Sequence, residues 1–283
     1  MTIKNELQKA CKNGDTELVR LLLRASLVNT PCCLNDPSAG NNYAIRRASD
    51  RGHTEVVKLL LNDPRVNPSA DDNDAIQRAS LKGHTKVVRL LLNDPRVDPS
   101  DDNNNAIRWA SKKGHTEIVK LLLNNHRVDP GDNNNLAIRW ASENGHTEVL
   151  QLLLNDPRVD PSAYNNCAVR WASENGRTEV VRLLLNDPRV DPSANDNYAI
   201  QRASENSHTE VVRLLLNDLR VDPSADNNFA IRQTKSVVIM DILLEKVHLP
   251  TDVDIKNYKK FLIKKKYLLK LLSTKVYDYS KLF

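Results

Sequence analysis

The chain has 283 residues and a net charge of +5, with 40% hydrophobic, 27% charged and 5% aromatic residues. This composition is that of a water-soluble protein with an aliphatic core, and no stretch approaches the roughly 18 to 20 apolar residues of a membrane helix. The N-terminal residues lack the apolar run of a secretory signal. No zinc or disulfide spacing is present, so we expect free thiols in a reducing compartment. The cysteines are Cys11, Cys32, Cys33 and Cys167.

The N-terminal segment carries an incomplete copy of a pattern that recurs along the chain. Its apolar residues have the spacing of two short helices on either side of Gly14. We predict a capping repeat over residues 1–30. The distance from Gly14 to Gly52 is 38 residues, against 31 between later equivalents. The seven extra residues predict an insertion loop over residues 31–41.

Six full repeats of 31 residues are predicted over residues 42–227. A Gly-His-Thr phrase begins at positions 52, 83, 114 and 145, with variants at positions 176 and 207. In the third repeat we predict Asn104 as a helix N-cap and Ile107 and Ala110 as one apolar face. Gly114 is predicted to end this helix with a positive φ. A second helix with an aliphatic face and a proline-containing loop complete the unit.

The C-terminal part departs from the repeat in two steps. Residues 228–248 are predicted to form a C-terminal capping repeat, because the turn is three residues shorter while the aliphatic second helix is retained. Residues 249–283 are predicted to form a basic amphipathic helical tail. From Lys246 onward the chain carries ten lysines and three acidic residues, or +7, whereas the remainder has 31 basic and 33 acidic residues, or −2.

A single repeat cannot fold alone. It offers about six large aliphatic side chains, each of which stabilises by about 1.5 to 3 kcal/mol when buried. Ordering its backbone costs about 1 to 2 kcal/mol per residue, so the loss of entropy is larger than the gain from burial. Neighbouring repeats must supply the missing interface, and we predict an all-α solenoid of stacked helix-turn-helix units.

The phrase Ala-Ile-Arg-x-Ala-Ser-x-x-Gly-His-x-x-Val-Val-x-Leu-Leu-Leu resembles the ankyrin repeat, and the resemblance covers about residues 5–245. It implies an ankyrin-repeat α-solenoid. The unit is two residues shorter than the family's usual one, and its loop carries proline. We therefore expect short loop or hairpin fingers, which can lack regular strands. The Asp-Pro-Arg-Val-Asp-Pro-Ser-Ala phrase is similar to ankyrin variants of amoebae and giant viruses.

No catalytic, metal or cofactor site is predicted. The histidines lie one per repeat, about 10 Å apart, which is too far for shared metal ligation. We interpret them as turn residues bonded to nearby backbone. They are His53, His84, His115, His146 and His208. The acidic cluster at residues 71–74 lacks the glycine and distal glutamate of a calcium loop. We interpret it as a solvated turn, with weak calcium binding as the alternative, and we predict no enzyme activity.

Positions that differ between repeats carry the information about binding, because the repeated residues build the frame. One such position on the first helix reads Arg47, Arg78, Trp109, Trp140, Trp171 and Arg202. The ankyrin resemblance places it in the concave groove. Tryptophan and arginine are the residue types most enriched in binding hot spots, so we predict a partner-binding groove here. Packing of each tryptophan across its neighbouring repeat is the alternative interpretation.

A second variable position follows four residues later on the same face. It reads Arg51, Lys82 and Lys113, and then asparagine in the last three repeats. Glutamate precedes each of those asparagines. The groove is therefore predicted to be basic toward the N-terminal repeats and more acidic toward the C-terminal ones, which would steer a partner with the opposite gradient. An ordinary solvated helix surface is the alternative.

The tail has three interpretations. It could close the end of the solenoid, or bind nucleic acid or an anionic membrane, or dock another protein such as a ubiquitin-ligase subunit. The lysines involved are Lys259, Lys260, Lys264, Lys265 and Lys266. The main prediction is a monomeric cytoplasmic adaptor that binds another protein, in the host cytoplasm if the source is viral, with the nucleus as the alternative location. The alternative function is an anionic-surface binder acting through the tail.

Overall fold

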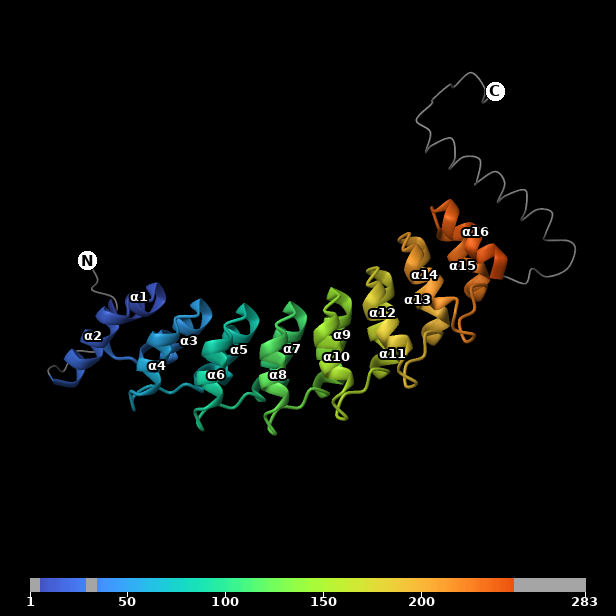
Figure 1. Ribbon diagram of the computed structural model, residues 1–283. Coiled ribbons are helices and arrows are strands. Elements are labelled where there is room, and N and C mark those ends of the chain that lie inside the picture. The colour runs from blue at the N-terminus through green and yellow to red at the C-terminus, as the bar shows by residue number, and fades with distance from the viewer. Residues whose placement is uncertain (1–5, 29–34, 247–283) are drawn as a thin grey trace, which may run out of the picture. The chain divides into compact units, whose positions relative to one another are not determined.

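The computed structural model describes residues 6–28 and 35–246, which form sixteen helices and no strand (Figure 1). The chain divides into two compact units, Met1–Pro161 and Ser162–Phe283. None of the helices in the described ranges is long and apolar enough to cross a membrane. The predicted tail over residues 249–283 and the first four residues of the predicted insertion loop over residues 31–41 lie outside these ranges.

The first unit holds five helix pairs, each made of a first helix, a tight turn and a second helix. First helices of successive pairs pack against one another in chain order, and the second helices form another row beside them (Figure 1). The bounds are α1 Glu6–Asn13, α2 Thr16–Val28, α3 Ala39–Arg51, α4 Thr54–Leu61, α5 Ala70–Lys82, α6 Thr85–Leu92, α7 Asp101–Lys113, α8 Thr116–Leu123, α9 Asp132–Asn144 and α10 Thr147–Leu154.

The second unit repeats this arrangement with three helix pairs in its described part. Its first helices α11, α13 and α15 pack in chain order, and so do its second helices α12, α14 and α16. The bounds are α11 Ala163–Glu174, α12 Thr178–Leu185, α13 Ala194–Glu205, α14 Thr209–Leu215, α15 Ala225–Gln233 and α16 Val237–Lys246. Both units therefore show the predicted stacking of helix-turn-helix pairs.

The core is aliphatic, as the scarcity of aromatic residues predicts. Small residues on the first helices allow close packing, and branched residues on the second helices fill the space between the rows. In the third repeat the fully buried side chains are Ala106, Ile107, Ala110, Ile118, Val119 and Leu122. The same positions are buried in the other full repeats, so one packing scheme serves the whole series.

The turn between the two helices is fixed by a glycine and by a histidine from the next repeat. Gly114 has φ 73°, as predicted for the residue that ends α7. The ring of His146 lies against it, so that a Cβ on Gly114 would stand 2.5 Å from His146 Nδ1. His146 Nε2 bonds the carbonyl oxygen of Lys112 at 3.0 Å. The prediction of turn histidines bonded to backbone is confirmed, and the backbone belongs to the preceding repeat.

Each first helix of a full repeat begins with one left-handed turn. In α7 the three residues Asp102, Asn103 and Asn104 have φ of 50°, 54° and 57°. Equivalent triplets occur in α3, α5, α9, α11, α13 and α15, and asparagine or aspartate fills nearly all of these positions. These two residue types tolerate positive φ better than other side chains. The repeated Arg or Gln of the helix reaches back to this turn, as Arg108 does by donating to the Asp102 carbonyl at 2.7 Å.

The predicted N-cap role of Asn104 is wrong. Its Oδ1 accepts the backbone N–H of Asp129 at 2.8 Å, and its Nδ2 donates to Asp132 Oδ2 at 2.8 Å. Both partners belong to the next repeat, 25 and 28 residues later. Asparagine suits an N-cap and a left-handed turn equally well, and here the inter-repeat hydrogen bonds decide between them.

The fingers that connect the pairs contain no strand among the described residues, so the expected short form is confirmed. An Asp-x-Arg clasp shapes most of them. Asp94 accepts the Arg96 backbone N–H at 3.0 Å and two guanidinium N–H groups at 2.9 and 2.6 Å. Arg96 also donates to the carbonyl oxygens of Val66 and Leu61, at 2.9 and 3.0 Å. The clasp thereby joins one finger to the preceding repeat.

This clasp predicts an acid-sensitive contribution to stability. The hydrogen bonds from Arg96 hold the pKa of Asp94 below its ordinary value, and Arg158 does the same for Asp156. A carboxyl group with a lowered folded-state pKa stabilises the fold above its unfolded pKa of about 4, and this contribution is lost as the pH falls through the folded pKa. We expect the stability advantage of the natural chain over Asp94→Asn/Asp156→Asn to shrink between about pH 5 and pH 2.

Urea unfolding followed by circular dichroism at a series of pH values measures this difference. The finger at residues 124–131 shows that asparagine fits this turn without distortion, because Asn125 stands at the clasp position and accepts the Arg127 backbone N–H at 3.0 Å. The Asp→Asn variants should therefore remove the charge and leave the turn intact. A stability difference that stayed constant over this pH range would contradict the role given to the clasp.

Candidate protein-interaction surface

The predicted groove residues all lie on first helices, at two positions per helix. The first position is half-buried in every repeat and holds Arg47, Arg78, Trp109, Trp140, Trp171 and Arg202. The second position is exposed and holds Arg51, Lys82 and Lys113. Seven of these nine residues belong to the first unit, and Trp171 and Arg202 belong to the second.

Trp109 and Trp140 form an aromatic cluster with a lysine that was not among the predicted site residues. The two ring centroids lie 5.2 Å apart, with the planes tilted by 34°. Lys112 Nζ lies 5.1 Å from the Trp109 centroid and 4.4 Å from the Trp140 centroid. A cation over two indole faces is attracted by both. We call these three residues the Trp-Lys cluster; it joins two adjacent repeats and leaves part of each ring open to solvent.

The arginines of the first unit are already engaged with their own helix or its neighbour. Arg47 Nη1 lies 3.6 Å from Asp50, and its guanidinium lies 5.0 Å from the Tyr43 ring centroid. Arg78 Nε bonds Asp74 at 2.6 Å, and this hydrogen bond raises the pKa of Arg78 above its ordinary value. The structure thus places both arginines on the predicted face, but as members of ion pairs.

Arg202 in the second unit is held in a similar way. It forms an ion pair with Glu205 at 2.5 Å and lies over Tyr198 and Phe229, at 4.9 and 5.7 Å from the ring centroids. The guanidinium of Arg170 also lies over the Tyr198 ring, 5.3 Å from its centroid. Trp171 accepts a hydrogen bond from Asn175 at its carbonyl oxygen. This face of the second unit is therefore a prepacked stack of aromatic and arginine side chains.

The exposed lysines differ from the arginines. No hydrogen bond or ion pair joins Lys82 or Lys113 to another part of the described chain. Arg51 is 56% exposed and lies 3.9 Å from Asp50, which it shares with Arg47. A shallow depression of about 370 Å³ opens beside Arg51 and Lys82, and its other walls are Asp50 and His84. These cations are the charges on this face that remain available to a partner.

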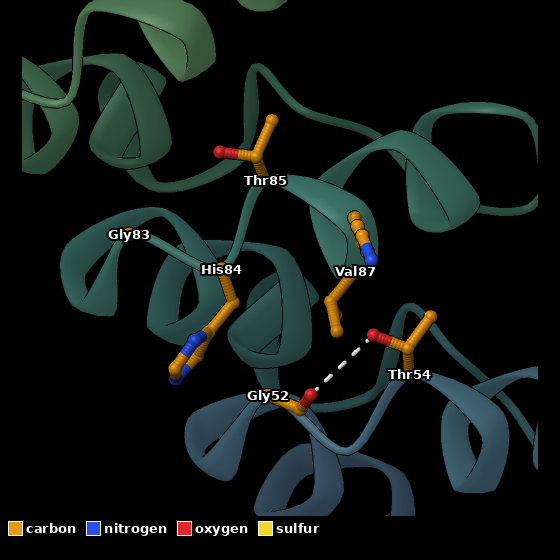
Figure 2. Close-up of a pocket in the computed structure, with 7 residues that line it drawn as sticks. Gly52, Thr54, Gly83, His84, Thr85 and Val87 are labelled. Atoms are coloured by element: carbon orange, nitrogen blue, oxygen red, sulfur yellow. Dashed lines mark hydrogen bonds between the residues drawn. The ribbon is translucent and has the colours of Figure 1, made fainter.

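A second depression, of about 220 Å³, lies between the turns of two successive repeats (Figure 2). Its lining comes from the turn residues Gly52, Gly83 and His84 and from the start of α6. Thr54 closes one side through a hydrogen bond from its hydroxyl to the Gly52 carbonyl, at 3.4 Å. His84 is committed to the Asp50 carbonyl at 3.0 Å. This hollow belongs to the structural joint between repeats.

The described part of the chain places the serines of the repeat and two cysteines in its core. It contains no group of three or more His, Cys, Asp or Glu side chains that could hold a metal ion. Ser111 and its equivalents are fully buried on the first helices. Cys11 and Cys167 are buried, and burial raises the pKa of Cys11 to about 12, which suppresses thiolate reactivity. The five predicted tail lysines and the Cys32-Cys33 pair lie outside the described residues.

Sequence reasoning missed the ion-pair partners, although a signal was present. Asp50 follows Arg47 by three residues, Asp74 precedes Arg78 by four, and Glu205 follows Arg202 by three. Pairs at these spacings face each other on a helix. Lys112 likewise follows Trp109 by three residues. The helical period therefore predicts that the arginines are paired and that Trp109 is covered by a cation.

These features define a helical repeat protein built from stacked helix-turn-helix pairs. The family model described as "Ankyrin repeats (3 copies)" matches the chain over residues 7–101, 76–165, 140–228 and 169–257. The chain belongs to the ankyrin-repeat family, whose fold is a general protein–protein interaction fold. None of the curated proteins compared with the chain matches it.

Two solved ankyrin repeat domains are similar in fold. The ankyrin repeat domain of Bcl-3, described as a unique member of the IkappaB protein family, is 22% identical, with a TM-score of 0.55 and coverage of 71% of this chain and 97% of that one. The human ASB11 ankyrin repeat domain is 20% identical, with a TM-score of 0.62 and coverage of 73% and 99%. At these identities the likeness establishes the fold alone.

Proposed function

We propose that this protein is a non-catalytic scaffold or adaptor that binds another protein through the face formed by its first helices. The observation that carries the proposal is the Trp-Lys cluster of Trp109, Lys112 and Trp140. It occupies a position that varies between repeats, on a frame whose other residues repeat. Large aromatic side chains that are partly open to solvent are the residues most often found at the centre of protein interfaces.

The outer surface offers much less to a specific partner. Exposed side chains of the second helices recur from unit to unit, as Glu55 and Glu117 do at equivalent positions. Their ion pairs, such as Arg182 with Glu179 at 3.3 Å, are exposed and contribute little energy. The finger clasps repeat as well. Specific recognition needs residues that differ along the chain, and these are concentrated on the first helices.

A tryptophan deletion tests the proposal. We expect Trp109→Ala/Trp140→Ala to reduce capture of the partner protein from cytosol by at least about tenfold, because each half-buried indole would lose its contact with the partner. The readout is affinity capture with mass spectrometry, and circular dichroism verifies that the variant is folded. Tyr164→Asn is the matched control, since Tyr164 is an aromatic residue that is 63% exposed at another site. Full retention of every partner by the tryptophan variant would refute the proposal.

The second candidate function is binding to nucleic acid or an anionic membrane through the C-terminal segment. It is favoured by the ten lysines between Lys246 and Phe283, which concentrate a charge of +7 in 38 residues. A chain ending at Lys246 should then lose all binding to nucleic acid and anionic vesicles. Such binding should also weaken steeply with salt, unlike an aromatic-centred protein interface. The proposal as a whole is of a monomer acting in the cytoplasm.

A further inference from the structure

The charges on the first-helix face of the first unit do not contribute equally to recognition. Arg46 bonds Asp71 and Asp74, Arg78 bonds Asp74, and Arg47 pairs with Asp50. These groups neutralise one another across α3 and α5. The arginines that the sequence singles out are therefore largely compensated before any partner arrives.

Four other cations on this face keep more of their charge. Lys82 and Lys113 have no ion pair within the described residues, and Arg51, whose side chain is 56% exposed, lies 3.9 Å from Asp50, an acid that it shares with Arg47. Lys112 is held by indole rings rather than by an acid. Arg51, Lys82 and Lys113 are the last residues of α3, α5 and α7, so they form a row with one cation per repeat. A partner that fits this row must be acidic.

The spacing of the row specifies the form of the partner. Adjacent packed helices lie about 8 to 10 Å apart, so successive cations recur at about that interval. A peptide in the extended polyproline II conformation has three residues per turn and rises about 3.1 Å per residue, so side chains three residues apart lie on one face and span one repeat. Carboxylates at positions i, i+3 and i+6 of such a chain would meet Arg51, Lys82 and Lys113 in turn. The depression of about 370 Å³ beside Arg51 and Lys82 has one acid in its wall, Asp50, against these two cations, so it still favours a carboxylate side chain.

The aromatic cluster favours a peptide over a nucleic acid. Binding of single strands uses open aromatic faces on which bases stack. Here the faces of Trp109 and Trp140 are taken up by each other and by Lys112, whose Nζ lies within 5.1 Å of both ring centroids. Both tryptophans remain half-buried, and the part of them that stays accessible suits an apolar side chain at the end of an acidic segment.

We propose that the partner segment bound by the first unit is an extended acidic peptide whose carboxylates recur at every third residue along the row of Arg51, Lys82 and Lys113. This inference rests on the proposed function and names its partner class. The Trp-Lys cluster anchors an apolar residue of the peptide, and the cation row sets its register.

Selection from a displayed library of random 16-residue peptides on the immobilised full chain tests the inference. We expect enrichment of acidic residues at i, i+3 and i+6 with the natural chain. With Lys82→Glu/Lys113→Glu this enrichment should be lost or reversed toward basic residues, and affinity for the enriched acidic peptides should fall about tenfold. Lys58→Glu/Lys120→Glu is the matched control, with the same change of net charge in the last turns of the exposed second helices α4 and α8.

The outcomes separate this inference from the proposed function. Enrichment of neutral or basic peptides, no enrichment at all, or an equal affinity loss in both charge variants would overturn the acidic-peptide inference. Loss of the captured protein partner by Trp109→Ala/Trp140→Ala would still support the scaffold in those cases. If the tryptophan variant still enriches acidic peptides, the role of the cation row is supported and the role of the Trp-Lys cluster as an anchor is refuted. Stronger retention of random single-stranded oligonucleotides than of any peptide would replace the peptide with a nucleic acid.

Discussion

Replacing Gly114 with alanine should lower the free energy of unfolding by about 2 to 5 kcal/mol, measured by urea unfolding followed by circular dichroism. Two separate costs combine. A side chain at φ 73° carries the strain of a left-handed conformation, of about 1 to 2 kcal/mol. The new Cβ would also stand 2.5 Å from Nδ1 of His146, so the next repeat must shift. Overpacking of this kind costs about 1 to 3 kcal/mol.

Two further variants separate these costs. In Gly114→Ala/His146→Ala the imidazole that clashes with the new Cβ is absent. The alanine at position 114 should then lower the free energy of unfolding only by its conformational strain. A double-mutant cycle should therefore show that the two substitutions are coupled. At the equivalent turn of the last full repeat a serine already stands at φ 65°. Ser207→Gly should therefore raise stability by up to about 1 kcal/mol. An alanine at position 114 that costs the same with and without His146 would disprove the packing of ring against turn.

Truncating Asn104 to alanine should cost about 2 to 4 kcal/mol in the same unfolding measurement. The change leaves the Asp129 N–H without its acceptor and removes the hydrogen bond to Asp132. This hydrogen bond is partly buried, and a buried donor that loses its partner costs about 1 to 3 kcal/mol. Alanine also tolerates φ 57° less well than asparagine, which adds about 1 kcal/mol.

The adjacent residue provides the control for this prediction. Asn103 has φ 54° and an exposed side chain, with no hydrogen bond from that side chain within the described residues. Asn103→Ala should therefore show the conformational cost alone, about 1 kcal/mol. The difference between the two variants measures the hydrogen bonds that cross from one repeat to the next. Equal losses in both would mean that these bonds contribute nothing net to stability.

The repeat period allowed much of the fold to be predicted. Gly114 ends its helix as expected, and Ile107 and Ala110 face the core, because apolar spacing and a positive-φ glycine are signals carried within one repeat. The left-handed turn at the start of each first helix was not predicted. Its asparagines and aspartates suit a cap, a loop or a left-handed turn, and the deciding hydrogen bonds come from residues 25 and 28 positions later.

The candidate surface stays a prediction, and its chemistry differs from what the sequence suggests. The variable residues lie on the first helices, at half-buried and exposed positions. Whether Arg78 is available to a partner depends on side-chain conformation, and Asp74 holds it at 2.6 Å. The contact of Trp109 with Trp140 depends on how closely two repeats pack, which the separate helices do not specify. The ion pairs in the structure, and not the sequence, therefore decide which cations are available to a partner.

The links between repeats have a consequence for how such a chain can change length. The turn histidine reaches back 34 residues, and the left-handed asparagine reaches forward 25, so each bond joins only nearest neighbours. Excising 31 residues, for example 84–114, places His115 directly after Gly83 and preserves these intervals. Recombination between equivalent positions of two repeats can thus add or delete whole repeats without creating a new kind of contact between neighbours. The row of surface side chains can then be lengthened or reordered while the scaffold stays the same.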